Sequence, residues 1–276
     1  MRVLLISSNS LKPSPQLPWV PVEPLGPAYV AAGLRAAGRD VEFLDLCFVE
    51  DRRAAVREAI ARSRPDVVGI SLRNVDLMAY FNPLSFVGEL EDIVDECRRR
   101  SAAPVILGGS GFSVMPGELL RFTGADAGIA GEGEWSFPRL LDRIERGEGY
   151  ADVPGVVLPS AGERGFEMAG AAFESLDRGM RPARDLVDGA RYRAAGGSAS
   201  IQTKRGCPFG CIYCTYPIVE GAAVRCRPPG EVAEEFRELF DRHGVRNAYV
   251  VDNQFNYPPS HAAEVCERLI AKRDEC

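Results

Sequence analysis

Residues 3–7 read Val3-Leu4-Leu5-Ile6-Ser7, an unbroken apolar run without the polar alternation of a half-exposed strand. Such a run is typical of a strand in a parallel sheet that is covered on both faces. Amphipathic stretches alternate with further short apolar runs along the first half of the chain, as in doubly wound domains. The strands predicted in this way cover residues 3–7, 41–46, 67–71, 104–107 and 127–130. We therefore expect an α/β domain over residues 1–149, with a five-stranded parallel sheet and helices on both faces.

A second series of alternating strands and helices follows a stretch of weaker pattern. Small residues, glycine and proline accumulate over residues 150–197, which predicts a linker with one hairpin near Val156. From residue 198 onward we expect strands at 199–203 and 248–251 and helices at 230–243 and 262–271. Two such units cannot close a β/α barrel. Residues 198–276 therefore resemble the N-terminal portion of a barrel, and the chain looks truncated.

Composition narrows the class of protein. The 276 residues are 46% hydrophobic and 26% charged, with a net charge of −6, which is ordinary for a globular protein. No run approaches the ~20 apolar residues of a membrane span, and the N-terminus lacks the features of a signal peptide. We expect a cytoplasmic protein. Its acidic charge offers no general attraction to phosphate backbones, so nucleic acid is not an expected partner.

Three of the eight cysteines crowd into the stretch KRGCPFGCIYC at residues 204–214, as Cys207, Cys211 and Cys214. In a reducing cytosol such a group indicates metal ligands or redox thiols rather than disulfides. The stretch follows a predicted strand, the position where β/α barrels build their active sites. A [4Fe-4S] cluster held by three thiolates keeps one iron open, whereas a structural zinc site is normally closed by four protein ligands. The spacing thus favours an iron–sulfur cluster, with a zinc loop as the alternative.

The pattern Cys-x3-Cys-x-aromatic-Cys, with Tyr213 at the aromatic position, resembles the signature of the radical S-adenosylmethionine superfamily. The resemblance implies that the three cysteines hold the cluster, that S-adenosylmethionine chelates the open iron, and that Tyr213 lies near its adenine. One electron from the reduced cluster then yields a 5′-deoxyadenosyl radical. Asp252 and Asn253 follow the second barrel strand and would accept from the ammonium of S-adenosylmethionine, although the family's Gly-Gly-Glu is missing there. A capping turn is the alternative for these two residues.

In the first domain, small and polar residues follow the predicted strands at the edge where doubly wound sheets bind ligands. No Gly-x-Gly-x-x-Gly follows the first strand, so a dinucleotide is not expected. Taken in order, these segments resemble the Rossmann-like (flavodoxin-like) B12-binding domain of cobalamin-dependent radical S-adenosylmethionine enzymes. A helix cap is the alternative for Glu132. The cobalamin-binding residues that the resemblance implies are Ser71, Leu72, Arg73, Gly108, Gly109, Ser110, Gly131, Glu132 and Gly133.

The two histidines, His243 and His261, both lie in the second domain, so the first cannot supply an imidazole ligand to cobalt. By resemblance to class members without such a ligand, cobalamin would be base-off, with Leu72 or Arg73 near its lower face. We expect this weak ligation to favour transfer of the methyl group as a radical.

The resemblance as a whole implies a methylase that uses cobalamin, a [4Fe-4S] cluster and S-adenosylmethionine on an unactivated carbon of a small-molecule or natural-product substrate. An electron donor such as flavodoxin or ferredoxin would serve it. Oxidative cyclisation or rearrangement with the same cofactors is one alternative, and a truncated fragment that binds cofactors without turnover is another. A zinc nucleic-acid module is disfavoured by charge and spacing. Of the five remaining thiols, we expect Cys226, Cys266 and Cys276 to be buried residues or, alternatively, ligands of an auxiliary cluster.

Overall fold

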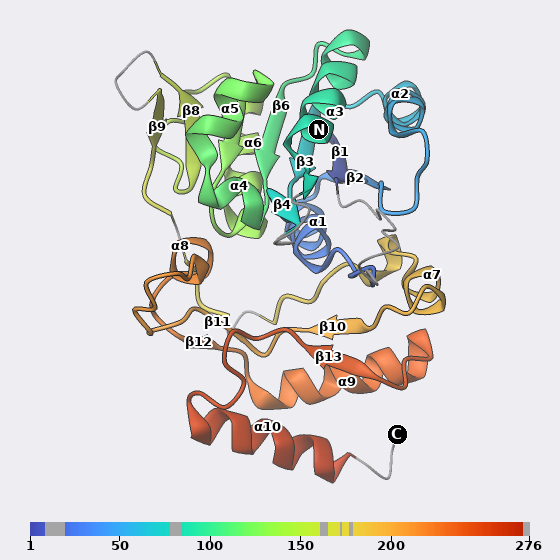
Figure 1. Cartoon of the computed structure of the whole chain (residues 1–276), viewed down its shortest axis with the longest axis vertical. Helices are drawn as coiled ribbons and strands as arrows, with labels where there is room; N and C mark the ends of the chain where they lie inside the picture. The colour runs from blue at the N-terminus through green and yellow to red at the C-terminus, as the bar shows by residue number, and fades with distance from the viewer. Residues whose placement is uncertain (9–19, 78–83, 161–164, 172, 177–178, 273–276) are drawn as a thin grey trace. The chain divides into compact units, whose positions relative to one another are not determined.

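The computed structural model describes residues 1–8, 20–77, 84–160, 165–171, 173–176 and 179–272 (Figure 1). The chain divides into two compact units, residues 1–12 with 26–173 and residues 13–25 with 174–276. Within the described ranges, no helix has the length and apolar character needed to cross a bilayer.

The first unit is built on one seven-stranded sheet, in the order β2-β1-β3-β6-β7-β8-β9. The first five of these strands in space run parallel, and all five coincide with predicted strands. Their apolar side chains are almost fully buried in β1, β3 and β6, as the unbroken apolar runs predicted. The bounds are β1 (Arg2–Ser7), β2 (Asp40–Asp45), β3 (Val67–Ser71), β6 (Val105–Gly108) and β7 (Ala127–Ile129).

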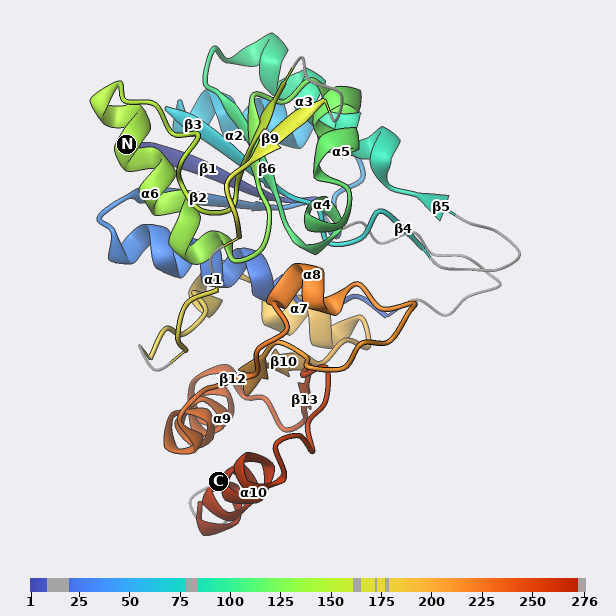
Figure 2. The same cartoon turned by 90° about the vertical axis from the view of Figure 1, so that its left-hand side faces the viewer.

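Helices cover both faces of this sheet (Figure 2). Helix α1 (Leu25–Ala36) packs against α6 (Gly133–Arg146) so closely that a Cβ on Gly33 would lie 2.3 Å from the carbonyl oxygen of Glu134. On the other face, α2 (Arg52–Ser63) packs against α3 (Val87–Arg100), and α3 packs against α5 (Pro116–Thr123). The doubly wound α/β class predicted from the sequence is therefore confirmed.

Two features of the first unit differ from the sequence-based expectation. The short helix α4 (Ser110–Val114) and α5 fill the connection from β6 to β7, where no helix was expected. In addition, β8 (Val156–Pro159) and β9 (Phe166–Met168) form an antiparallel hairpin that extends the sheet beside β7. The first unit consequently ends at Phe173 rather than at residue 149, because the predicted hairpin is part of the sheet and not of a free linker. In addition, β4 (Asp76–Leu77) pairs antiparallel with β5 (Leu84–Ser85).

The second unit contains two parallel strands, β10 (Ala199–Ile201) and β13 (Ala248–Val250), covered by α9 (Pro229–His243) and α10 (Pro259–Ala271). Both strands and both helices fall where they were expected. Their shared core consists of Ala199, Ile201, Val232, Leu239, Val245 and Val265. Smaller elements surround it: a 3-10 turn (Arg184–Leu186), α7 (Gly189–Ala194), α8 (Tyr216–Glu220), and the antiparallel pair β11 (Lys204–Arg205) and β12 (Arg225–Cys226).

A short N-terminal segment belongs to this second unit, although the sequence placed it in the first domain. Glu23 is buried there, with its carboxylate 3.3 Å from Arg184 and 3.8 Å from Arg193. Burial raises the pKa of Glu23, and the two guanidinium groups oppose that shift. These ion pairs explain why residues before α1 group with residues after 174.

Candidate functional site

The segment that carries the three cysteines, residues 206–221 and hereafter the cysteine loop, is closed at its base. The backbone N–H of Cys207 donates to the carbonyl of Gly221 at 3.1 Å, and β11 pairs with β12 on either side of the loop. Gly206 has φ +85°, and a Cβ there would lie 2.0 Å from the carbonyl oxygen of Ala223. Glycine is therefore required at the entrance to the loop.

The thiols occupy different environments along this loop. Cys207 is buried near the base, Cys211 is exposed, and Cys214 is intermediate. A bond of 3.1 Å from the Cys214 N–H to the Cys211 carbonyl closes a turn between the last two. As the side chains stand, no three His, Cys, Asp or Glu residues of the described chain are grouped closely enough to hold a metal ion. Three soft sulfur donors on one loop with a fixed base and an exposed middle nonetheless fit a cluster bound by three thiolates.

Asp252 lies at the base of the cysteine loop but not in an open position. Its buried carboxylate accepts from the backbone N–H of Thr203 at 2.7 Å and from that of Lys204 at 3.4 Å. The Thr203 hydroxyl and the ammonium of Lys204, at 2.9 Å, also donate to it. Because these donors occupy both oxygens, the expected contact of Asp252 with a ligand ammonium finds no support in the geometry. The carboxylate instead ties the end of β13 to the end of β10.

Asn253, the second residue expected near S-adenosylmethionine, differs in this respect. Its Nδ2 donates to Oε2 of Glu220 at 2.8 Å. Its Oδ1 is buried and accepts from no donor of the described residues. A buried acceptor without a donor is costly, and it fits a ligand that brings an ammonium or hydroxyl group. Tyr213 is 86% exposed on the neighbouring loop.

Glu220 is a residue of this site that the sequence analysis missed. It ends α8, and its carboxylate accepts hydrogen bonds from Gln202 and Gly206 at the start of the cysteine loop and from Asn253. A lone glutamate at the end of a five-residue helix carries no spacing pattern, so the sequence offered no signal for it.

In the first unit, the structure joins two of the loops expected to hold cobalamin. The Leu72 N–H donates to the carbonyl of Gly108 at 2.8 Å, and the Ser110 hydroxyl donates to the carbonyl of Arg73 at 2.7 Å. Gly109 has φ +95°, and a Cβ there would lie 2.4 Å from the Leu72 carbonyl oxygen and 2.8 Å from Oγ of Ser71. The loops after β3 and β6 therefore form one surface at the carboxyl edge of the sheet. Leu72 is buried within it and Arg73 is exposed.

The third expected loop, Gly131 to Gly133, connects to the same edge through Ser113. The Ser113 hydroxyl donates to the Gly109 carbonyl at 2.9 Å and accepts from the Gly131 N–H at 2.9 Å. Glu132 is buried at the N-cap position of α6, and its side chain makes no capping hydrogen bond to that helix.

One further polar atom lies at the switch point between β1 and β3, where doubly wound sheets bind their ligands. The Ser7 hydroxyl is buried there without a partner in the described part of the chain. Glycine-lined backbone and an orphaned hydroxyl at this edge fit a cofactor such as cobalamin.

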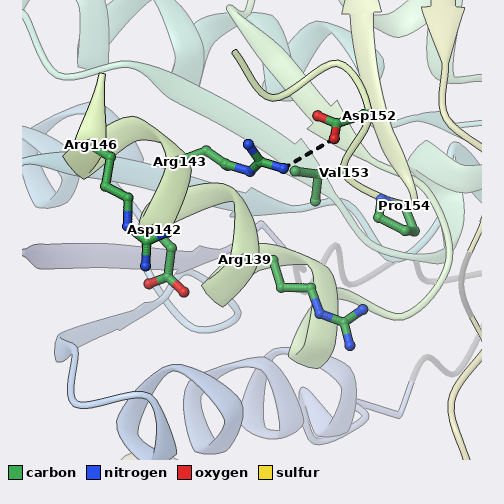
Figure 3. Close-up of a pocket in the computed structure, with 7 residues that line it drawn as sticks. All are labelled: Arg139, Asp142, Arg143, Arg146, Asp152, Val153 and Pro154. Carbon is green, nitrogen blue, oxygen red and sulfur yellow. Dashed lines mark hydrogen bonds and ion pairs between the residues drawn. The ribbon is translucent and has the colours of Figure 1, made fainter. Parts of the chain in front are cut away.

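A surface pocket elsewhere on the first unit does not involve any expected site residue (Figure 3). Its volume is about 260 Å³, and its polar lining includes Arg143, which pairs with Asp152 at 3.1 Å. Asp142 in turn pairs with Arg39. Both aspartates of the lining are thus already engaged in ion pairs, and we assign no ligand to this pocket. The lining comprises Arg139, Asp142, Arg143, Arg146, Asp152, Val153 and Pro154.

The other cysteines are dispersed over separate elements. Cys226 lies on β12 and Cys266 is exposed on α10. Cys276, the third candidate for an auxiliary cluster, lies outside the described residues. No group of ligands forms around the two described thiols.

Comparison with known proteins gives a family match and several relatives. Residues 20–141 match the B12 binding domain family. The tryptophan 2-C-methyltransferase of Streptomyces laurentii is 27% identical over 322 aligned residues, which cover 99% of this chain and 52% of that protein. The hopanoid C-3 methylase of Methylococcus capsulatus is 32% identical, and the alignment covers 90% of this chain and 45% of that protein. The chain thus spans about half the length of these curated relatives.

Solved structures agree with the sequence relatives. The radical S-adenosylmethionine methyltransferase TsrM from Kitasatospora setae, solved with tryptophan and an S-adenosylmethionine analogue, matches with a TM-score of 0.86 at 30% identity. The match covers 100% of this chain and 52% of TsrM. A second TsrM structure, which contains cobalamin and a [4Fe-4S] cluster, also matches with a TM-score of 0.86, at 28% identity. The enzyme OxsB, at 17% identity and a TM-score of 0.78, shares the fold.

Proposed function

We propose that this chain, which belongs to the cobalamin-dependent radical S-adenosylmethionine methyltransferase family, holds cobalamin in its first unit and a cluster with S-adenosylmethionine in its second. With these cofactors it would take part in methylating an unactivated carbon. The observation that supports the proposal is that one chain carries two candidate sites in the order expected for this family, the cobalamin site before the cluster site. Joined glycine-rich loops lie at the carboxyl edge of the first sheet, and a closed loop with three thiols follows β10.

In the second unit, Cys207, Cys211 and Cys214 would ligate the cluster. When bound, the cluster supplies the electron that cleaves S-adenosylmethionine. Asn253 would accept a hydrogen bond from the ammonium of S-adenosylmethionine, since its Oδ1 lacks any other donor among the described residues. Tyr213 would lie against the adenine, which an exposed aromatic side chain on the same loop supports.

In the first unit, the loops after β3, β6 and β7 would hold cobalamin by their backbone. Close approach is possible because glycines line this edge. The chain's two histidines, His243 and His261, both belong to the second unit, so no imidazole of the first unit is available to cobalt. We therefore expect the cofactor to be base-off, with Arg73 as the exposed residue that can reach its lower face. Held there without a protein nitrogen ligand, cobalamin would supply a methyl group for transfer as a radical.

The partners follow from this chemistry. We expect a small-molecule or natural-product substrate and a low-potential electron donor such as flavodoxin or ferredoxin, both met in the cytoplasm. The related TsrM was solved with tryptophan as substrate, and a small organic molecule is the class we propose for this chain.

Anaerobic reconstitution with iron, sulfide and hydroxocobalamin tests the proposal. We expect about four iron and four sulfide ions per chain. We expect one bound corrinoid, whose cobalt(II) form shows no nitrogen splitting in its EPR spectrum. When the reconstituted chain is reduced in the presence of S-adenosylmethionine, we expect 5′-deoxyadenosine to form. Zinc without sulfide, or no corrinoid binding, would contradict it. If both cofactors bind but no 5′-deoxyadenosine forms, the chain is a binding fragment that needs further sequence for turnover.

A further inference from the structure

Glu220 connects three parts of the second unit through the two oxygens of one carboxylate. Oε1 accepts from Nε2 of Gln202 at 2.8 Å. Oε2 accepts from the backbone N–H of Gly206 at 3.3 Å and from Nδ2 of Asn253 at 2.8 Å. All three groups are donors, so the site requires a side chain that accepts with both of its terminal atoms, as the two oxygens of Glu220 do.

Two of these contacts fix the direction of an amide. Gln202 cannot turn its amide around, because its Oε1 already accepts from Nε of the buried Arg205 at 2.8 Å. Asn253 has no such second restraint in the described residues. Its Nδ2 faces Glu220, and its Oδ1 consequently faces away as a buried acceptor without a donor. Glu220 alone therefore decides whether Asn253 presents an oxygen or an NH2 group.

We propose that Glu220 is a positioning residue that orients the Asn253 amide so that its oxygen, and not its nitrogen, meets the ammonium of S-adenosylmethionine. The inference rests on the proposed function, because it names S-adenosylmethionine as the ligand. It adds a residue whose carboxylate bonds to Gln202, Gly206 and Asn253 and to none of the three cluster cysteines in the described hydrogen bonds. Its effect is transmitted through one hydrogen bond.

The variant Glu220→Gln separates the alternatives. The new amide has one acceptor and one NH2 group. Its oxygen is needed by Gln202 at 2.8 Å, whose orientation Arg205 fixes. Its NH2 group therefore faces Asn253, and only the longer bond from the Gly206 N–H, at 3.3 Å, is given up. The Asn253 amide then turns to offer Oδ1 to the introduced glutamine and leaves Nδ2 at the free position. An NH2 group there repels an ammonium, and we expect S-adenosylmethionine to bind about tenfold more weakly.

The double variant Glu220→Gln with Asn253→Asp exchanges the amide and the carboxylate across the same hydrogen bond. The introduced aspartate accepts from the NH2 group of the introduced glutamine with one oxygen and presents the other at the free position. We expect this exchange to restore the affinity for S-adenosylmethionine to at least that of the unchanged chain. Glu267→Gln is the matched control, because Glu267 is exposed on α10 and the same chemical change there should leave the affinity unchanged.

Two measurements decide the outcome. The first is the dissociation constant of S-adenosylmethionine for the reconstituted chain. Binding is monitored by the change in the EPR signal of the reduced cluster. The second is urea unfolding of the cofactor-free chain, where the exchange variant should recover the stability lost in Glu220→Gln. If the unchanged chain binds S-adenosylmethionine and Glu220→Gln binds it equally well, or if the exchange rescues neither quantity, the role of Glu220 is refuted. If the unchanged chain holds a cluster but does not bind S-adenosylmethionine, the proposed function fails instead.

Discussion

Lys204 and Asp252 form a buried ion pair between the ends of β10 and β13, with 2.9 Å between Nζ and Oδ2 and side-chain exposures of 4% and 0%. The same ammonium donates to the carbonyl of Phe255 at 2.8 Å and lies 5.1 Å from the centre of its ring. Lys204 is three residues before Cys207, so this pair fixes the backbone from which the cysteine loop begins.

Removing the charge of Asp252 should destabilise the second unit strongly. In Asp252→Asn the ammonium of Lys204 stays buried without its counter-charge, which costs about 3–5 kcal/mol. The double change Lys204→Met with Asp252→Asn removes both charges and should recover part of that loss. Urea unfolding monitored by hydrogen exchange of peptides from residues 199–205 would measure both variants. Equal stability of the single and double variants would contradict the importance of the pair.

The conformation of Gly206 should control cluster assembly. Gly206→Ala places a Cβ against the Ala223 carbonyl at a positive φ, so the base of the cysteine loop has to shift. We expect a clear loss of iron incorporation during anaerobic reconstitution. Gly210→Ala is the control in the same loop, since a Cβ there meets nothing within 4 Å. Equal iron content in the two variants would show that the base geometry is unimportant.

Cobalamin binding should depend on Gly109 in the same way. Gly109→Ala puts a Cβ against the Leu72 carbonyl and forces apart the loops after β3 and β6. We expect weaker binding of hydroxocobalamin in an absorbance titration, with a dissociation constant raised at least about tenfold. Gly88→Ala on α3, where a Cβ meets nothing within 4 Å, should bind as the unchanged chain does. A thermal unfolding curve for each variant separates a local effect on the loops from loss of the fold.

Cys97 should be chemically silent in the folded chain. Burial chiefly raises the pKa of its thiol from 9.0 to about 12, and Glu96 adds to the shift. The neutral thiol is therefore the folded form, and its contribution to stability is complete below pH 9 and is lost as the pH rises from 9 toward 12. At about pH 8.5, iodoacetamide should label the exposed Cys266 and spare Cys97 until urea is added. Labelling is measured by peptide mass spectrometry. Labelling of Cys97 before urea is added would contradict the prediction.

Much of the fold could be predicted because its strands are fully buried. Runs such as Val3–Ser7 and Val67–Ser71 must be apolar at every position, so they stand out against the amphipathic helices around them. Residues 110–123 escaped prediction because Ser110, Gly111, Pro116 and Gly117 suggest a loop. Tertiary packing overrides that tendency, with Phe112 fully buried against Gly128.

The site was predictable only where residue identity carries its own chemistry. The spacing of Cys207, Cys211 and Cys214 indicated a cluster, since thiols at that interval have few other uses in a reducing compartment. The partners of a carboxylate cannot be read in this way. Asp252 and Glu220 look alike in the sequence, but the first binds the end of a strand and the second orients a neighbouring amide.

The bond between Cys207 and Gly221 has an entropic consequence. Bringing together the ends of a flexible segment of about 15 residues costs on the order of 2 kcal/mol or more. In this protein the polypeptide meets that cost when it folds, before any iron arrives. The affinity for the metal then depends on the iron–sulfur bonds and on ordering a few solvent-exposed side chains. Chelators should therefore remove the metal without unfolding the second unit.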